Sequence, residues 1–226
     1  MHKAVAIVSG GLDSVTLAYL LRSENYDLHL LAFNYGQRHV KEVEYARLCA
    51  TRLDAAFDLI DLTSVGRLLK GSALTDDIAV PHGHYAAPSM AITVVPNRNA
   101  IMLAVAYGVA VAENAEIVAT AVHAGDHPIY PDCRPAFIAA FDAMQRVAVE
   151  GCGHPELRLH APFVHIGKHD IVALGARLGV PFADTWSCYE GRELHCGRCG
   201  TCVERKEAFQ LAGVPDPTVY AEVVSK

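Results

Sequence analysis

The chain has 226 residues, a length that suits one domain of ordinary size or one domain with a small appendage. Hydrophobic residues make up 52% of it and charged residues 19%, a composition that excludes a disordered chain. The formal net charge of -6 argues against a protein whose main task is to grip a nucleic-acid backbone, because such proteins need clustered positive charge.

The first third of the chain predicts alternating strands and helices. Apolar runs at 4–8, 28–33 and 57–62 are typical of strands buried on both faces of a parallel sheet. A Gly-rich turn at 9–14 leads into a helix, and a second helix fits 40–53. This order predicts an α/β fold, a Rossmann-like parallel sheet with helices on both faces.

The remaining elements continue the same alternation after a long irregular stretch. Residues 71–96 lack periodicity and contain several Gly and Pro, so we expect a long loop that acts as a lid. The later elements are predicted as a helix at 99–114, a strand at 116–122, a helix opened by Pro135, a short strand at 160–163, a helix at 168–178, an irregular stretch at 187–202 and a last helix at 204–211.

The chain shows no targeting or membrane-spanning signal. The apolar start, residues 1–8, is too short for a signal-peptide core with its cleavage site. The apolar stretch 100–112 is shorter than the roughly 20 residues that a membrane span needs. We therefore expect a cytoplasmic protein without membrane partners.

The Gly-rich turn has the features of a phosphate-binding loop. It consists of Ser9, Gly10, Gly11, Leu12, Asp13 and Ser14. Two glycines let backbone N–H groups approach an anion, and the following helix adds the positive end of its dipole. Asp13 beside a phosphate makes sense if it holds Mg²⁺ or caps the helix. The simpler alternative is a strand-to-helix turn without a ligand.

This turn resembles the PP-loop, Ser-Gly-Gly-x-Asp-Ser, of the N-type ATP pyrophosphatases. No Gly-Lys-Ser/Thr follows it, so it is not a Walker A loop. Members of the resembled superfamily typically bind the pyrophosphate end of ATP here and transfer AMP to a substrate oxygen. The resemblance implies that ATP binds at Val8 and at the loop 9–14.

Four of the seven cysteines cluster near the C-terminus, separated by seven, two and two residues. They are Cys188, Cys196, Cys199 and Cys202. Thiolates at this spacing can converge on one tetrahedral Zn²⁺, and a site with all four positions filled by protein is structural. An iron–sulfur cluster is the alternative, since four cysteines also hold iron. His195 could compete as a ligand, but a second-shell or solvated histidine is the preferred interpretation.

Two polar stretches are further candidates: 35–39 follows the second predicted strand, where ligands of open α/β sheets bind, and 95–99 precedes the predicted helix 99–114. In the stretch 35–39, Arg38 could clamp a phosphate or carboxylate, and His39 could pair with the same anion. In the stretch 95–99, Arg98 could meet a phosphate, whereas Asn99 is a fair helix N-cap. A solvated helix start and simple capping are the alternatives.

Two further candidates lie later in the chain. The Pro-rich stretch 125–135 contains Asp126 and Asp132, and a carboxylate can accept paired N–H donors from a guanine-like edge. Asp132 could instead cap the helix that Pro135 opens. Lys168 begins a helix, where a cation opposes the dipole unless it meets a phosphate.

Taken together, these runs resemble the 7-cyano-7-deazaguanine synthase family. The matching runs arrive in the family's order and are residues 9–14, 35–39, 96–99, 125–135 and the four cysteines. Asn97 departs from the pattern, because many family members have glycine there. The resemblance implies conversion of 7-carboxy-7-deazaguanine and ammonia into the nitrile through an adenylated carboxylate and an amide, with ATP, Mg²⁺ and one structural Zn²⁺.

The resemblance also implies roles for individual residues. Transition-state stabilisation falls to Asp13, Ser14, Arg98 and Lys168, and Arg38 joins the ATP-binding loop. The substrate-binding residues would be Tyr35, Gln37, Arg98, Asn99, Asp126, Tyr130, Asp132 and Arg134. We expect a PP-loop domain at 1–186, a zinc segment at 187–226 packed on it, and a homodimer.

Two rival interpretations remain open at the level of sequence. A PP-loop tRNA-modifying thiolase would need a free catalytic cysteine and a basic surface; Cys49 and Cys133 keep it possible, while the net charge of -6 opposes it. Another amide-forming ligase would share the same loop. A zinc-bearing binding module without catalysis is disfavoured, because an inactive copy has no reason to keep the intact loop 9–14.

Overall fold

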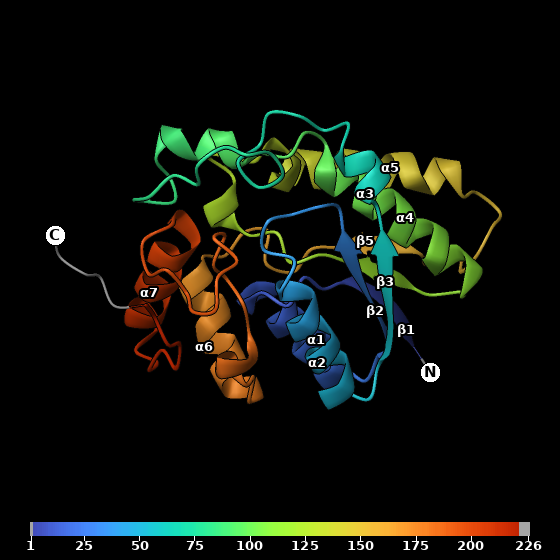
Figure 1. The fold of residues 1–226 in the computed structure, drawn as a ribbon. Helices are drawn as coiled ribbons and strands as arrows, with labels where there is room; N and C mark the ends of the chain where they lie inside the picture. Colours follow the sequence, from blue (N-terminus) through green and yellow to red (C-terminus); the bar gives the residue numbers. More distant parts are fainter. Residues whose placement is uncertain (1, 222–226) are drawn as a thin grey trace, which may run out of the picture.

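A computed structural model describes residues 2–221, and within them a five-stranded parallel sheet forms the centre of the molecule (Figure 1). The strand order is β3-β2-β1-β4-β5. The strands are β1 (Lys3–Ile7), β2 (Asp27–Asn34), β3 (Ala56–Asp61), β4 (Ile117–Ala119) and β5 (Arg158–His160). Because β1 lies between β2 and β4, the chain reverses its direction of winding beside β1, where open α/β sheets bind ligands.

Helices cover both faces of the sheet. One layer holds α1 (Leu12–Ser23), α2 (Glu42–Arg52), α6 (Lys168–Leu178) and α7 (Gly200–Ala212). The other holds α4 (Arg98–Ala112), α5 (Pro135–Ala148) and the short α3 (Thr63–Gly66) (Figure 1). The expected α/β fold with helices on both faces is therefore confirmed.

The strands are buried on both faces because successive side chains point to opposite sides of the sheet. In β1, Ala4 and Ala6 pack into the core beneath α1 and α6, whereas Val5 packs into the core beneath α4. Each of these three side chains is fully buried. The all-apolar sequence of this strand follows directly from its central place in the sheet.

Most predicted elements form within one or two residues of their expected bounds. The helix predicted at 168–178 forms over those residues as α6, which Gly179 ends in the left-handed conformation. The strand predicted at 160–163 is wrong: β5 spans Arg158–His160, because register with β4 selects the paired residues and not the apolar run. The helix predicted at 204–211 begins earlier, at Gly200, since Cys199 forms its N-cap.

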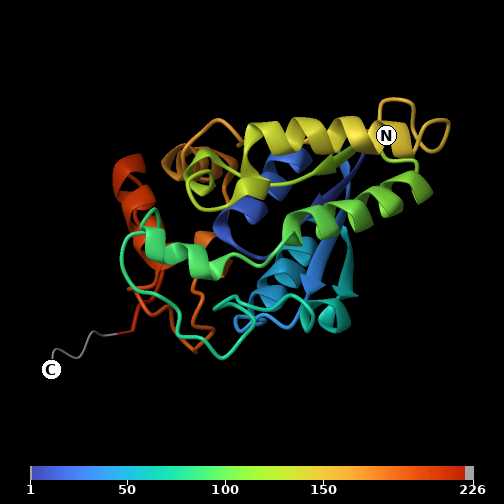
Figure 2. The ribbon, with the colours of Figure 1, turned by 90° about the horizontal axis from the view of Figure 1, so that it is seen from above.

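The long segment 71–96 contains the six-residue 3₁₀ helix η1 (Pro88–Thr93) and is otherwise irregular. It lies beside the C-terminal segment (Figure 2). An isolated β-bridge joins His82 to Cys199, and the N–H of Gly83 donates to the carbonyl of Arg198 at 3.0 Å. The segment therefore covers the region between the sheet and the cysteine cluster.

Within residues 2–221, no helix combines the length and apolar character that a bilayer crossing needs. The predicted zinc segment at 187–226 extends past this range, and residues 222–226 lie outside the described part of the chain.

The turn after β1 packs tightly against α2. Gly10 has φ +87°, and a Cβ at this position would lie 2.2 Å from the carbonyl oxygen of Glu42 and 2.7 Å from the backbone nitrogen of Ala46. Both the backbone conformation and the space therefore require glycine. On its other side, the Gly10 carbonyl accepts a hydrogen bond from the Trp186 N–H at 2.9 Å.

Alanine substitutions at Gly10 and Gly71 separate the cost of the close contact with α2 from the cost of backbone strain. Gly10→Ala is expected to lower the free energy of unfolding by more than about 3 kcal/mol, because strain and overpacking add. Gly71 also has positive φ, but a Cβ there meets nothing within 4 Å, so Gly71→Ala should lower the free energy of unfolding by only about 1 kcal/mol. Denaturant titration measures both; equal losses would contradict the packing argument.

Candidate active site

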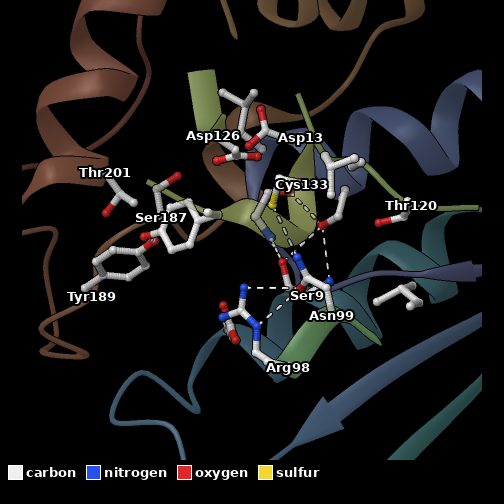
Figure 3. A pocket seen from close by; sticks show the side chains of 18 of the residues that line it. Ser9, Asp13, Arg98, Asn99, Thr120, Asp126, Cys133, Ser187, Tyr189 and Thr201 are labelled. Atoms are coloured by element: carbon white, nitrogen blue, oxygen red, sulfur yellow. Dashed lines mark hydrogen bonds between the residues drawn. The ribbon is translucent and has the colours of Figure 1, made fainter. Parts of the chain in front are cut away.

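A cavity of about 250 Å³ opens at the carboxyl ends of β1, β2 and β4. Its lining comes from segments far apart in the sequence: the loop 9–14, the starts of α2, α4 and α6, the loop after β4, and the C-terminal segment around α7. Figure 3 shows Asp13 and Asp126 near one another, Arg98 and Asn99 on another side of the pocket, and Tyr189 on a separate wall.

Side-chain hydrogen bonds hold the Gly-rich loop closed on itself. The Ser14 hydroxyl accepts from the Ser9 N–H at 3.2 Å and donates to the Gly11 carbonyl at 3.2 Å. The hydroxyl of Ser9 lies 3.2 Å from that of Ser14 and accepts from the Gly11 N–H at 3.3 Å. The loop is thus formed before any ligand arrives, with α1 beginning at Leu12 and no side-chain cap on its first turn. This arrangement suits an anion.

A buried ion-pair cluster stands beside this loop. The Lys168 ammonium lies 3.2 Å from the Asp13 carboxylate and donates to Glu204 at 2.5 Å. The ring of His123 lies between 3.6 and 3.9 Å from the carboxylates of Asp126, Asp13 and Glu204. Burial alone would lower the pKa of Lys168, but the carboxylates of Asp13 and Glu204 outweigh it and hold the pKa above its ordinary value.

The charges of this cluster do not balance. Three carboxylates, of Asp13, Asp126 and Glu204, face one lysine, although burial raises the pKa of Glu204 toward the neutral form. One oxygen of Asp13, Oδ1, is buried with no hydrogen-bond partner among the described residues. A buried acceptor without a partner is unfavourable, so this corner fits an additional cation.

A second cationic group marks the wall formed by α4. The Arg98 guanidinium donates to the Tyr35 hydroxyl at 3.2 Å and lies 5.7 Å from the centre of the Tyr35 ring. Asn99 donates to the Cys133 sulfur at 3.3 Å, and its own N–H donates to Asp132 at 3.2 Å. The guanidinium is therefore fixed in place before a ligand binds (Figure 3).

Aromatic hydroxyls line the rest of the cavity. The Tyr130 hydroxyl lies 2.7 Å from that of Thr93 and 3.3 Å from that of Tyr189. Tyr130 and Tyr189 both line the cavity, together with Tyr85 and Met90 from the 71–96 segment. A flat heterocyclic ligand could stack and hydrogen-bond against such a wall.

The turn after β2 contributes a buried histidine, and the start of α2 contributes a carboxylate. His39 is 4% exposed, and its Nε2 lies 3.5 Å from Glu42 Oε1. Gln37 donates to the same Glu42 oxygen at 3.2 Å. Both His39 and Glu42 line the cavity.

The four cysteines gather at the N-terminus of α7. All four are buried, and their sulfur atoms lie within 4.8 Å of one another. The Cys196–Cys202 sulfur distance of 4.0 Å is close to the roughly 3.8 Å edge of a tetrahedron with 2.3 Å metal–sulfur bonds. The N–H groups of Cys196 and Cys199 donate to cluster sulfurs at 3.3 Å, which stabilises thiolates. The donor set therefore fits a tetrahedral metal ion.

Most of the predicted site residues line the cavity. They are Val8, Ser9, Gly11, Leu12, Asp13, Ser14, Tyr35, Arg98, Asn99, Asp126, Tyr130 and Lys168. Gly10 lies behind the loop, against α2. His195, considered as a competing ligand, does not belong to the cysteine group; it accepts from the Ser187 N–H and packs against the Trp186 ring.

Other predicted residues turn away from the cavity. Arg38 is exposed and donates to the carbonyls of Asp76 and Ile78, so assigning it to ATP is not supported by its position. Arg134 is exposed and donates to the His127 carbonyl. Alternate residues of one loop point to opposite sides, so a motif does not reveal which of its members face a ligand.

Three further predicted residues make contacts other than those expected. Gln37 is absent from the cavity lining; it folds the turn by donating to the Phe33 carbonyl and Glu42. Asp132 accepts from Asn99 at the start of α4 and does not reach the cavity. The predicted N-cap Asn99 lies inside α4, because Asn97 forms the cap with φ 56°, a conformation that suits asparagine and glycine.

Sequence reasoning missed His123, Glu42, Glu204 and Tyr189. His123 follows β4, where a polar residue after a buried strand is a usable signal. Glu204 was interpreted only as the start of a helix, and the sequence contains no local sign that α7 returns it to the loop 9–14. For Glu42, Glu204 and Tyr189, tertiary packing alone brings the side chain to the cavity.

Comparison with known proteins identifies the family. The family model described as "Queuosine biosynthesis protein QueC" matches residues 3–213. The chain is 62% identical to the 7-cyano-7-deazaguanine synthase of Ruegeria sp. (strain TM1040), over 97% of this chain and 94% of the relative. It is 61% identical to the protein of the same name from Brucella anthropi, with the same coverage of both chains.

Among solved structures, the chain is similar in fold to NMN synthetase from Francisella tularensis. The TM-score is 0.52 at 17% identity, with 94% of this chain and 77% of that chain covered. At such low identity the similarity supports the fold of the sheet and its helices only.

Proposed function

The chain belongs to the QueC family, and from this premise we propose that it makes 7-cyano-7-deazaguanine from 7-carboxy-7-deazaguanine, ammonia and ATP. The observation that supports the proposal most strongly is the preformed loop 9–14 with Lys168 and Arg98 at one cavity, in a chain 62% identical to a synthase of that name. Adenylation explains the need for such a loop, since a carboxylate is a poor electrophile until its oxygen leaves as part of AMP.

We propose two activation cycles at this one site. The first joins the substrate carboxylate to the α-phosphorus of ATP and releases pyrophosphate; ammonia then displaces AMP and gives the amide. The second adenylates the amide oxygen, and loss of AMP leaves the nitrile. The N–H groups of the loop 9–14 would receive the pyrophosphate, and Lys168 would stabilise charge that develops on it.

Mg²⁺ is the cation that fits the charge imbalance beside the loop. Asp13, whose Oδ1 lacks a partner among the described residues, would hold it, with Asp126 or Glu204 nearby. The ion would supply positive charge that lets ATP phosphates approach three carboxylates. Oxygen donors are the ligands that Mg²⁺ prefers.

The substrate would lie between Arg98 and the tyrosine wall. Its carboxylate suits the fixed guanidinium of Arg98, and its bicyclic ring suits the faces and hydroxyls of Tyr130 and Tyr189. Among the acids that line the cavity, we assign Asp126 to the N–H donors of the guanine-like edge.

The four cysteines would hold one structural Zn²⁺. The ion would fix the start of α7, and thereby Glu204, against α6. We propose that residues 187–226 form a zinc segment on a PP-loop domain of residues 1–186, in a cytoplasmic enzyme. A thiolase is disfavoured, because burial raises the pKa of Cys133 and keeps its thiol protonated and poorly nucleophilic.

We further propose that the enzyme is a homodimer that uses the outer face of α5. That face presents a stripe of exposed apolar residues at helical spacing: Ala136, Ala139, Ala140, Ala143, Met144 and Val147. Met144 is 50% and Val147 76% exposed. A continuous apolar stripe on a surface helix is typical of an interface.

Substituting Val147→Glu should convert the dimer into a monomer, because it would bury a charge in the interface. The matched control is Leu211→Glu, at a 65% exposed position near the end of α7. Light scattering after size exclusion gives the mass of each variant. A wild-type monomer, or a V147E dimer, would contradict this assignment.

The proposed reaction makes a direct prediction for Lys168. Purified protein with ATP, Mg²⁺, ammonium and 7-carboxy-7-deazaguanine should yield the nitrile by mass spectrometry, with the amide appearing first. Lys168→Met should lower kcat/KM at least about 100-fold, as expected for removal of a charge-stabilising group. Lys70→Met, on an exposed lysine, is the control. ATP turnover without nitrile would disprove the proposed reaction.

Metal analysis tests the cysteine cluster. We expect one zinc per chain, and Cys188→Ser should abolish stoichiometric binding and lower the melting temperature, since metal binding contributes to folding. Cys152→Ser serves as the control, because Cys152 is exposed and lies outside the cluster. Iron with inorganic sulfide, or a metal content unaffected by C188S, would rule out this assignment.

A further inference from the structure

The polar pair at the end of β2 takes no part in the adenylation steps described above. His39 and Glu42 line the same cavity as the loop 9–14, yet within residues 2–221 no ion pair joins them to Asp13 or Lys168. Gln37 holds the Glu42 carboxylate from behind, at 3.2 Å. The cavity therefore has a second buried carboxylate site, separate from the cluster beside the phosphate-binding loop.

This pair has unused hydrogen-bonding capacity. His39 is only 4% exposed, and its Nδ1 has no hydrogen-bond partner in the described part of the chain. The Glu42 side chain is 13% exposed, and it accepts from Gln37. A small hydrogen-bonding ligand would satisfy the unpaired imidazole nitrogen, which is costly to leave alone in a buried place.

The surroundings set the protonation of both groups near neutral pH. Burial lowers the pKa of His39 to about 3, and the Arg98 cation acts in the same direction, so the imidazole stays neutral. Burial raises the pKa of Glu42 to about 8, against the opposing effects of Gln37 and Arg98. The Tyr189 ring packs at a tilt against the His39 ring, with 5.3 Å between centroids. With a pKa of about 8, only the ionised fraction of Glu42 can accept a proton at neutral pH, and the fraction grows as the pH rises toward 8. A group that titrates this near the working pH is suited to general base catalysis.

The proposed reaction needs a base of this kind. Ammonia in neutral water is mostly ammonium, which has no lone pair with which to attack an acyl adenylate. A site that binds ammonium must offer acceptors and then remove one proton. Among the carboxylates that line the cavity, Asp13, Asp126 and Glu204 all lie in the cluster around Lys168 and His123.

We propose that Glu42 and His39 form the ammonium-binding subsite, in which Glu42 is the base and His39 the positioning residue; this rests on the proposed synthase function. One N–H proton of ammonium passes to the Glu42 carboxylate, giving ammonia and a neutral carboxylic acid. The ammonia lone pair forms the new bond to the acyl carbon, and the bond from that carbon to oxygen breaks. AMP leaves with the electron pair, and the surplus proton on nitrogen goes to water.

Arg98 connects this subsite to the substrate. Its guanidinium lines the same cavity as His39 and Glu42, and its positive charge lowers the pKa of both. The same guanidinium would hold the substrate carboxylate close to the released nucleophile.

The test compares Glu42→Gln with Glu44→Gln, an exposed acid on the same helix that leaves the subsite intact. Substrate-dependent ATP–pyrophosphate exchange measures adenylation, which uses no nitrogen nucleophile. The KM for ammonium measures how well the subsite captures its ligand. Hydroxylamine, largely neutral at neutral pH, replaces ammonium without needing a base and gives a hydroxamic acid.

We expect E42Q to raise the KM for ammonium at least tenfold, to keep exchange within about threefold of wild type, and to form hydroxamate at a rate within about threefold of wild type. E44Q should match wild type in all three assays. An unchanged KM for ammonium, or equal losses with ammonium and hydroxylamine, would overturn the proposal. Loss of exchange would overturn it too, since Glu42 would then act in adenylation. If wild type itself makes no nitrile, the proposed function fails instead.

Discussion

The buried ion pair of Lys168 with Asp13 and Glu204 connects the parts of the site. It joins the phosphate-binding loop, the start of α6 and the helix that begins at the cysteine cluster. A buried ammonium without its carboxylates would be strongly unfavourable, so each segment must be in place for the others to be stable. Through this ion pair, the segment that carries the four cysteines contacts the Gly-rich loop, although the two lie far apart in sequence.

The cavity separates two kinds of charge. Near the loop 9–14, carboxylates and one lysine form a cluster that suits a metal-bound phosphate chain. After β2, His39 and Glu42, the first residue of α2, form a second buried pair on the same cavity as Arg98. A substrate bound between them would expose its carboxylate to ATP from one side and to the nitrogen nucleophile from the other. The parallel sheet makes this possible, because the carboxyl ends of its strands meet at one edge.

Features fixed by local sequence could be predicted, and those fixed by packing could not. The strand–turn–helix of the loop 9–14 and the start of α6 at Lys168 follow from apolar runs, glycines and caps, and the structure has them in place. Arg38, assigned to ATP from the motif, lies outside the cavity lining, because sequence alone does not tell which side of a turn faces the cavity. Glu42 and Glu204 were missed since only the packing of α2 and α7 brings them there.

The central claim is that ATP activates the substrate oxygen by forming an adenylate. Substrate labelled with ¹⁸O in its carboxylate tests this most directly when the nucleotide products are examined by mass spectrometry. The account predicts that each AMP released on the way to the nitrile carries one ¹⁸O, while pyrophosphate carries none. Detection of ¹⁸O in inorganic phosphate, or in water alone, would contradict adenylation. It would also contradict the role assigned to the loop 9–14.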